Sequence, residues 1–229
     1  MKLSAFFAQE LKSVWECSPL TSLANMDHQR EFFVARDDAQ IQKMIKEVLE
    51  EVLNTDPSIL STPTTVATTE ATKPLPLALC CVWHPPTLKM LLDHGLACPA
   101  DVSDNYTDLI DLWNKSLKHN FRKEPYTAAL TERAQRLGES LSLLRNAGVD
   151  WSLPSNTHKD FLDQFICHTP QDYPEFLVER YIHHQLPVSS AASSAAQYAR
   201  NPAVLSLVQK RILSDELTAL GARNPLRKL

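Results

Sequence analysis

The sequence KPLPLALCCVWHPPTLKMLLDHGLACPAD, residues Lys73 to Asp101, holds the clearest pattern in the chain. Apolar residues from Leu79 to Trp83 predict a short helix, Pro85 and Pro86 interrupt it, and a second helix is expected from Thr87 to Gly95. Two short antiparallel helices joined by a tight turn form an αα-hairpin. Such a hairpin is too apolar to be stable alone, so we expect it to stack against similar hairpins.

The same order of helix, break and helix recurs along the rest of the chain. One apolar stripe runs from Leu109 to Leu117, and the next helix ends in LSLLRNAGVD, Leu141 to Asp150, which repeats the ending of the first hairpin. A third copy breaks at Thr169-Pro170, and a fourth, which opens with a helix expected over Ala191 to Arg200, breaks at Asn201-Pro202. Repeated helical hairpins are typical of a solenoid, so the expected fold class is all-α.

These hairpins resemble ankyrin repeats, whose period is about 33 residues. The matching stretches are Leu75-Pro76-Leu77-Ala78 for the opening L-H-x-A, Met90 to Gly95 for the closing L-L-x-x-x-G, and Ala147-Gly148-Val149-Asp150 for A-G-A-D. The interval from Gly95 to Thr107 also equals that from Gly148 to Asp160, which are the expected starts of the next repeats. Because the two glycines are further apart than one repeat, an insertion is expected between His119 and Leu130.

The resemblance covers about residues 73–215 and implies an ankyrin-like helical solenoid with N-terminal capping helices. Residues 1–60 are expected to form that helical cap, because the apolar end of a solenoid must be covered; a separate functional subdomain is the alternative. Residues 61–72, STPTTVATTEAT, predict a threonine-rich loop. The degenerate repeats then occupy residues 73–220 and a tail occupies 221–229. An irregular α-solenoid or a helical bundle is the alternative fold.

Composition narrows the class of partner. The 229 residues carry a net charge of −4, which disfavours nucleic acid because phosphate binding relies on clustered Lys and Arg. The 4 glycines against 15 prolines disfavour an all-β fold, because tight β-turns draw heavily on glycine. No segment has the roughly 18 apolar residues of a membrane span, so no membrane association is expected. Five cysteines in no regular framework indicate reduced thiols and a cytoplasmic location.

Cysteine and histidine residues lie close together in the sequence at two places. Cys80 and Cys81 lie near His84, but a nucleophilic thiol must be exposed with a base in hydrogen-bond reach, whereas these thiols fall in an apolar helix. The pair His183-His184 lacks the four ligands of a structural zinc site. We therefore expect no catalytic residue, no metal site and no cofactor.

Six residues near the expected loop tips are predicted to bind a partner: Asp104, Asn105, Tyr106, Trp151, Asn156 and His158. The prediction rests on the aromatic pair, because Tyr and Trp are enriched among residues that carry binding energy. For Trp151 the alternative is that it packs beneath its own hairpin.

The sequence as a whole predicts a non-enzymatic protein-protein interaction module. Its mild acidity favours a partner protein with a basic surface. A sharper form of this prediction is a bacterial cytosolic immunity or antitoxin protein that binds and blocks a toxin. The alternative is a secreted bacterial effector or adaptor whose repeats bind a host or target protein.

Overall fold

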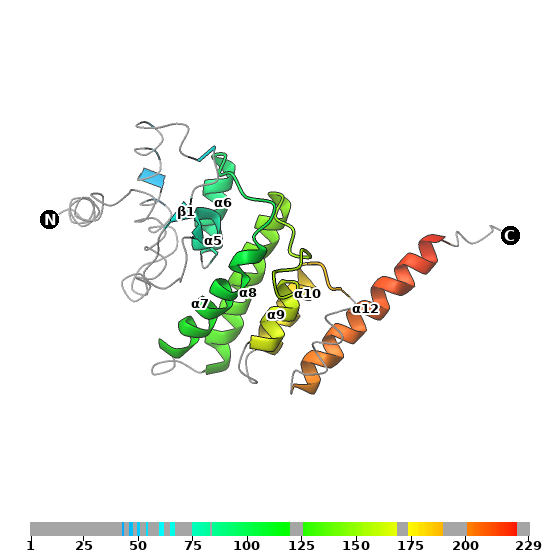
Figure 1. The fold of residues 1–229 in the computed structure, drawn as a ribbon. Coiled ribbons are helices and arrows are strands. Elements are labelled where there is room, and N and C mark those ends of the chain that lie inside the picture. The colour runs from blue at the N-terminus through cyan, green and yellow to red at the C-terminus, as the bar shows by residue number, and fades with distance from the viewer. Residues whose placement is uncertain are drawn as a thin grey trace. The chain divides into compact units, whose positions relative to one another are not determined.

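The computed structural model describes residues 43, 46–47, 50, 54, 60–61, 65–66, 75–82, 84–119, 126–168, 174–189 and 201–223. This part of the chain is mostly helical, so the all-α prediction is confirmed (Figure 1). Most of the predicted cap and threonine-rich loop, the predicted helix at 191–200 and the end of the tail lie outside the described residues. The chain divides into two compact units, Met1–Ala100 with Glu139–Val149, and Asp101–Gly138 with Asp150–Leu229.

The first compact unit contains two short strands and two short helices in the region of the predicted hairpin, of which the first begins at Leu77 and not at Leu79. Strand β1, Thr65–Val66, pairs antiparallel with β2, Leu75–Pro76, so two residues of the predicted threonine-rich loop belong to a strand. Helix α5 spans Leu77–Cys80 and α6 spans Pro85–Asp93. Helix α6 therefore begins at the prolines and not at Thr87, because proline suits the first helical position, where no backbone N–H is needed. The His84 ring accepts a hydrogen bond from the Thr87 N–H and caps this start.

The second compact unit contains the later helices, except that the residues of α8 from Glu139 onward belong to the first unit. They are η1, Ser103–Asn105; α7, Tyr106–His119; α8, Tyr126–Asn146; α9, Phe161–His168; α10, Pro174–His183; and α12, Pro202–Arg223. Helix α7 packs against α9, α9 against α10, and α10 against α12 (Figure 1).

The insertion predicted between His119 and Leu130 lies only partly within the described residues. Helices α7 and α8 have 14 and 21 residues, whereas α9 and α10 have 8 and 10. Helix α7 extends to His119 and α8 already begins at Tyr126. The described ends of this stretch are therefore helical, and the insertion itself stays a prediction.

Helix α9 lies in the core of the second unit. Six consecutive residues, Phe161 to Ile166, are buried, including Asp163 and Gln164. A helix buried on all sides has other elements around it, as α7 and α10 are around α9. By contrast, the second half of α12 is open, with Leu213, Leu217 and Leu220 exposed by 58%, 68% and 55%.

Three of the described helices end in the same way. At the ends of α6, α8 and α10, a residue with positive φ follows the helix: Gly95 at 89°, Gly148 at 105° and Gln185 at 56°. The N–H of the next residue then returns to a carbonyl of the last turn, in the pairs Leu96 to Leu91, Val149 to Leu144 and Leu186 to Tyr181, at 3.0, 3.0 and 3.2 Å. This is the Schellman arrangement, in which both residues of each pair are apolar, and here all of them are buried.

Candidate protein-binding loop edge

Two loops of the second unit form what we call the loop edge: residues 101–105, which lead into α7, and residues 150–160, which lead into α9. Each loop opens with the sequence Asp-x-Ser. The Ser103 N–H donates to Asp101 Oδ1 at 2.9 Å, and the Ser152 N–H donates to Asp150 Oδ1 at 2.9 Å. Aspartate forms such turns because its carboxylate can replace a backbone carbonyl as acceptor. Both loops therefore start with the same turn.

Tyr106 joins the two loops. It directly follows the first loop, its side chain is buried, and its hydroxyl lies 3.3 Å from the carbonyl oxygen of Asp150 and 3.2 Å from that of Leu153. The hydroxyl donates toward both oxygens, and a buried hydroxyl needs such a partner. Tyr106 therefore fixes residues 150–153 relative to the start of α7.

An aromatic cluster lies beneath the loop edge. The ring of Phe161 is 5.4 Å from Tyr106, 5.2 Å from Trp151 and 6.2 Å from Tyr181, measured between centroids. All four side chains are buried, and aromatic contacts at such distances add to the free energy of apolar burial. The loop edge therefore rests on a packed base.

The tip of the second loop is a short turn. The Ser155 N–H donates to the Lys159 carbonyl at 2.9 Å, and the His158 N–H donates to the Ser155 carbonyl at 2.8 Å. His158 has a φ of 60°, so the chain reverses over three residues of which the last is left-handed, as in the common three-residue hairpin loop. Asn156 and His158 are exposed at this tip.

Gln164 holds the tip in place from below. Its side chain is only 1% exposed, and its Nε2 donates to the hydroxyls of Ser155 and Thr157, the second at 3.0 Å. Its Oε1 accepts a hydrogen bond from the Thr107 hydroxyl at 3.3 Å. A buried amide with all these partners orders the groups that it binds. The tip is thus attached to α9 and, through Thr107, to α7.

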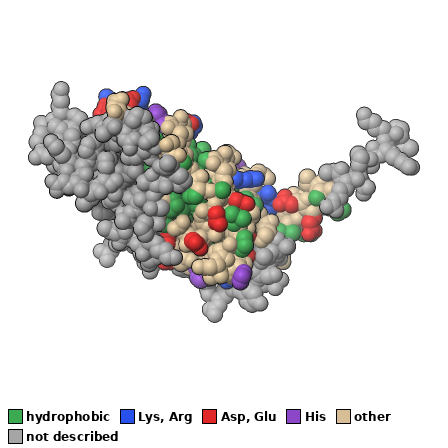
Figure 2. Space-filling model, turned by 45° about the horizontal axis from the view of Figure 1, so that its top comes forward, with side chains coloured by type: hydrophobic (Ala, Val, Ile, Leu, Met, Phe, Trp, Pro, Cys, Tyr) green, Lys and Arg blue, Asp and Glu red, His purple; other side chains and the backbone are tan. Residues whose placement is uncertain are grey.

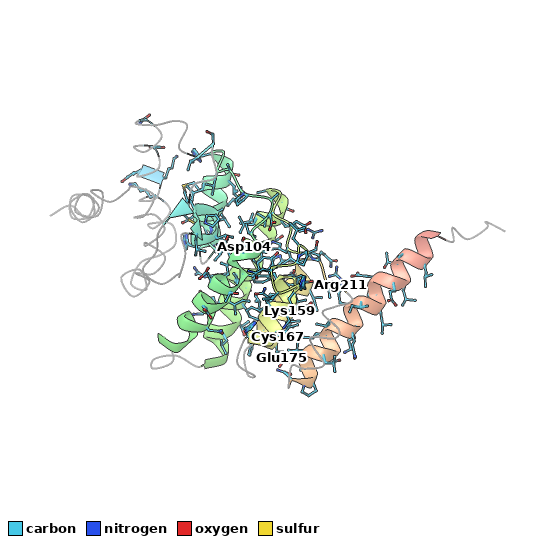
Figure 3. The ribbon with its side chains drawn as sticks, viewed as in Figure 1. Asp104, Lys159, Cys167, Glu175 and Arg211 are labelled. Carbon is cyan, nitrogen blue, oxygen red and sulfur yellow. The ribbon has the colours of Figure 1, made fainter. Side chains whose placement is uncertain are left out.

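The loop edge carries acidic side chains. Asp101, Asp104 and Asp150 are exposed, and the hydrogen bonds from Ser103 lower the pKa of Asp101. Burial raises the pKa of Tyr106, and the negative charges of Asp160, Asp101 and Asp150 raise it further. Figure 2 shows acidic side chains at several places on the described surface, and Figure 3 labels Asp104 from the first loop and Lys159 from the second.

The six residues predicted to bind a partner all belong to the loop edge or to its base. Asp104, Asn156 and His158 are exposed and Asn105 is half-buried. Tyr106 and Trp151 are 0% exposed, so the structure corrects the expectation that these two side chains lie at loop tips. The alternative for Trp151, packing beneath its own loop, is the arrangement found. The partner-binding role of the set stays a prediction.

Sequence reasoning missed the residues that shape the loop edge. Gln164, Thr107 and Ser155 were not predicted, although Gln164 stands inside the apolar run from Phe161 to Ile166. A polar residue at a core position must find hydrogen-bond partners. The position of Gln164 within the apolar run could therefore have indicated a buried hydrogen-bond network. The repeated Asp-x-Ser at Asp101 and Asp150 was a second signal.

The described cysteines differ in their surroundings. Cys81 is buried, and burial raises the pKa of Cys98 to about 11, opposite to the shift that activates a thiol. Cys167 is exposed and accepts a hydrogen bond from Lys159 Nζ at 3.4 Å. The described part of the chain has no group of three or more His, Cys, Asp or Glu side chains placed to hold a metal ion.

The loop edge can offer backbone and side-chain hydrogen bonds and negative charge to another molecule. Its exposed polar side chains stand on a base that buried contacts hold in one geometry. Among the helices described, none is long and apolar enough to cross a bilayer. No family model, no curated protein and no solved structure matches the chain.

Proposed function

We propose that this chain is a protein-binding module built as a divergent ankyrin-like solenoid. The three equivalent helix ends at Gly95, Gly148 and Gln185 support repeated units, since each closes a helical pair with the same hydrogen bonds. The Gln185 end was not expected from the sequence, because glycine is absent there. One local geometry at three points of the chain favours a repeated architecture over an irregular bundle.

The order of helix contacts supports the same proposal. In a solenoid, the first helix of one repeat packs on the first helix of the next, and second helices do likewise. Helix α7 packs on α9, which are first helices, and α10 packs on α12, which are second helices. The loop edge then corresponds to the connections between successive repeats, where such proteins present exposed residues.

We propose that the loop edge binds a basic surface on a partner protein. One observation carries this proposal: Asp101, Asp104 and Asp150 are exposed on two loops that Tyr106 and Gln164 hold in place. Carboxylates on a rigid base lose little conformational entropy on binding, and they attract a basic partner during the encounter. Catalysis is no part of this proposal.

The test compares two triple variants of the full chain. The first carries Asp101→Asn, Asp104→Asn and Asp150→Asn; asparagine keeps the oxygen that accepts the serine N–H, so the turns are retained while three charges are lost. The control removes three exposed charges elsewhere, with Asp111→Asn, Glu175→Gln and Glu179→Gln. Each is used for affinity purification from native lysate with quantitative mass spectrometry, followed by titration of the purified partner.

We expect a partner whose affinity falls about tenfold in the first variant, since three rim charges at about 0.5 kcal/mol each give that ratio. The control variant should bind as the unchanged chain does. Added salt should weaken the unchanged chain more than the first variant. Equal binding by both triple variants would contradict the assignment of the loop edge.

The immunity-protein and effector forms of the proposal differ in what residues 1–60 do. Deleting these residues leaves partner affinity and biological effect intact if the repeats alone block a toxin. Retained affinity with a lost biological effect supports an effector or adaptor, in which the first 60 residues supply a second activity. Affinity in this experiment is measured with the partner that the affinity purification recovers.

A further inference from the structure

Helix α9 begins with two buried carboxyl groups one turn apart. Asp160 precedes the helix and is 6% exposed, and Asp163 lies in its first turn and is 3% exposed. Asp160 Oδ1 accepts a hydrogen bond from the Asp163 N–H at 2.8 Å, so Asp160 caps the helix. Its other oxygen, Oδ2, accepts a hydrogen bond from the Ser189 hydroxyl at 2.8 Å. Asp160 thereby joins the end of the loop edge, the start of α9 and the segment after α10.

Asp163 differs from Asp160 in its hydrogen bonding. Its Oδ1 is buried, and no described residue forms a hydrogen bond with it. Leaving a buried carboxylate oxygen unpaired is costly, and the cost falls when the group binds a proton. Burial raises the pKa of Asp163 to about 6, the charge of Asp160 adds to this, and Lys159 acts against it.

Few charged groups act on the pair within the described residues. Lys159 is the cation that acts on Asp163, but its Nζ donates to Cys167 Sγ at 3.4 Å. From α7, Tyr106 lies close enough to Asp160 for that charge to raise the phenol pKa. The segment after α10 contributes the neutral hydroxyl of Ser189. Burial also raises the pKa of Asp160, while its hydrogen bonds from Asp163, Ser189 and Leu162 lower it.

We propose that Asp160 and Asp163 form a proton-binding pair that makes two contacts dependent on pH: the cap that Asp160 forms on α9, and the attachment of the Ser189 segment to Asp160. With one proton bound, the pair carries a single negative charge, which the cap and the Ser189 hydroxyl already stabilise. Loss of that proton places two negative charges within one buried helical turn. The side chains of Tyr106 and Gln164 do not change charge when this proton is lost, so their hydrogen bonds keep the tip of the loop in place. The hydrogen bonds of Asp160 with the Asp163 N–H and the Ser189 hydroxyl weaken.

The direction of the pH effect follows from linkage. The pKa of Asp163 is higher in the folded chain, at about 6, than its ordinary value of 3.8. The folded state therefore binds more protons than the unfolded state between these values, and the contribution to stability is lost as pH rises through about 6. From pH 5 to pH 7.5, this one group should raise the unfolding equilibrium constant about tenfold.

The first test titrates the carboxyl carbons of Asp160 and Asp163 by NMR in the unchanged full chain. We expect one of the pair to titrate with a midpoint near 6, because the two groups share one proton. Midpoints below about 4.5 for both groups would overturn the proposal, since such values are ordinary for aspartate. This measurement needs no variant and no partner.

The second test uses Asp163→Asn, which mimics the protonated group, and Asp111→Asn as an exposed control on α7. We expect Asp163→Asn to lose the tenfold change in unfolding constant, while the control keeps it. Hydrogen exchange at the Asp163 and Gln164 amides, which donate to Asp160, should speed up between pH 5 and 7.5 beyond the intrinsic change, except in Asp163→Asn. If Asp163→Asn does not fold, the exchange measurement on the unchanged chain and on Ser189→Ala decides. Exchange rates that follow only the intrinsic change would refute the pH-dependent attachment, and the proposed partner binding would be unaffected.

Discussion

Gln185 occupies a position that the other two described Schellman ends give to glycine. Its φ of 56° lies in the left-handed region, like those of Gly95 and Gly148. Glutamine has a Cβ atom that makes this conformation unfavourable, whereas glycine has none. We therefore expect Gln185→Gly to stabilise the chain, against the general rule that new glycines destabilise.

The magnitude follows from two opposing effects. The left-handed conformation costs a residue with a Cβ about 1–2 kcal/mol. A glycine gives the unfolded chain extra freedom, which costs about 0.5–1 kcal/mol on folding. The hydrogen bonds of this end, Gln185 N–H to Ile182 O at 3.0 Å and Leu186 N–H to Tyr181 O at 3.2 Å, use only the backbone and are kept. The net gain should be about 0.5–1 kcal/mol.

The assay is urea unfolding of the full chain and of three variants. Gln185→Ala removes the side chain but keeps a Cβ, so the difference between Gln185→Gly and Gln185→Ala isolates the backbone effect. Gly148→Ala is the reciprocal change and should cost about 1 kcal/mol, since no atom lies within 4 Å of the added Cβ and only the positive φ opposes it. If Gln185→Gly is no more stable than Gln185→Ala, the energetic equivalence of the three helix ends is refuted.

Three further substitutions test the base of the loop edge and the packing of α8. Tyr106→Phe removes the hydroxyl that lies near two loop carbonyls and should cost about 1 kcal/mol in urea unfolding, with faster amide exchange at residues 150–153. Trp151→Ala should cost about 3–5 kcal/mol, because the side chain is fully buried, and an exposed loop-tip tryptophan would cost far less. Gly138→Ala should cost about 1–3 kcal/mol in thermal unfolding, because the new Cβ would lie 3.0 Å from Arg180 Cβ; a neutral result would contradict the close approach of α8 and α10.

The helical pairs could be predicted because their signals are local. The apolar spacing and the glycines at Gly95 and Gly148 marked two helix ends that the structure confirms. The third end, at Gln185, could not be predicted, because the residue that would announce a left-handed conformation is missing. The start of α6 was misplaced for a related reason: Pro85 interrupts a preceding helix but also begins the next one.

The loop edge was predictable only in part. Its location follows from the loops before α7 and α9, but loops have no periodicity that separates buried from exposed positions. The sequence therefore left two alternatives for Trp151, an exposed tip or packing beneath its own loop. Its contacts with Tyr106 and Phe161, which are distant in sequence, show that it packs. The role of Gln164 depends on Thr107 and Ser155, which come from two other segments, and such a network is visible only in the folded chain.

Three of the described helices use the same kind of backbone hydrogen bond at their starts, and three use the same backbone geometry at their ends, with different residues. What each start needs is an acceptor for free backbone N–H groups, and His84, Asp160 and Asn201 each accept such a bond with a different side chain. Each end needs a left-handed residue, which Gly148 supplies without strain and Gln185 supplies at a cost. Because several residues satisfy each requirement, the backbone arrangement constrains the sequence only weakly. Residues near the helix starts can therefore differ in charge and ionisation. At the start of α9, the buried carboxyl group of Asp163 lies next to the cap that Asp160 forms.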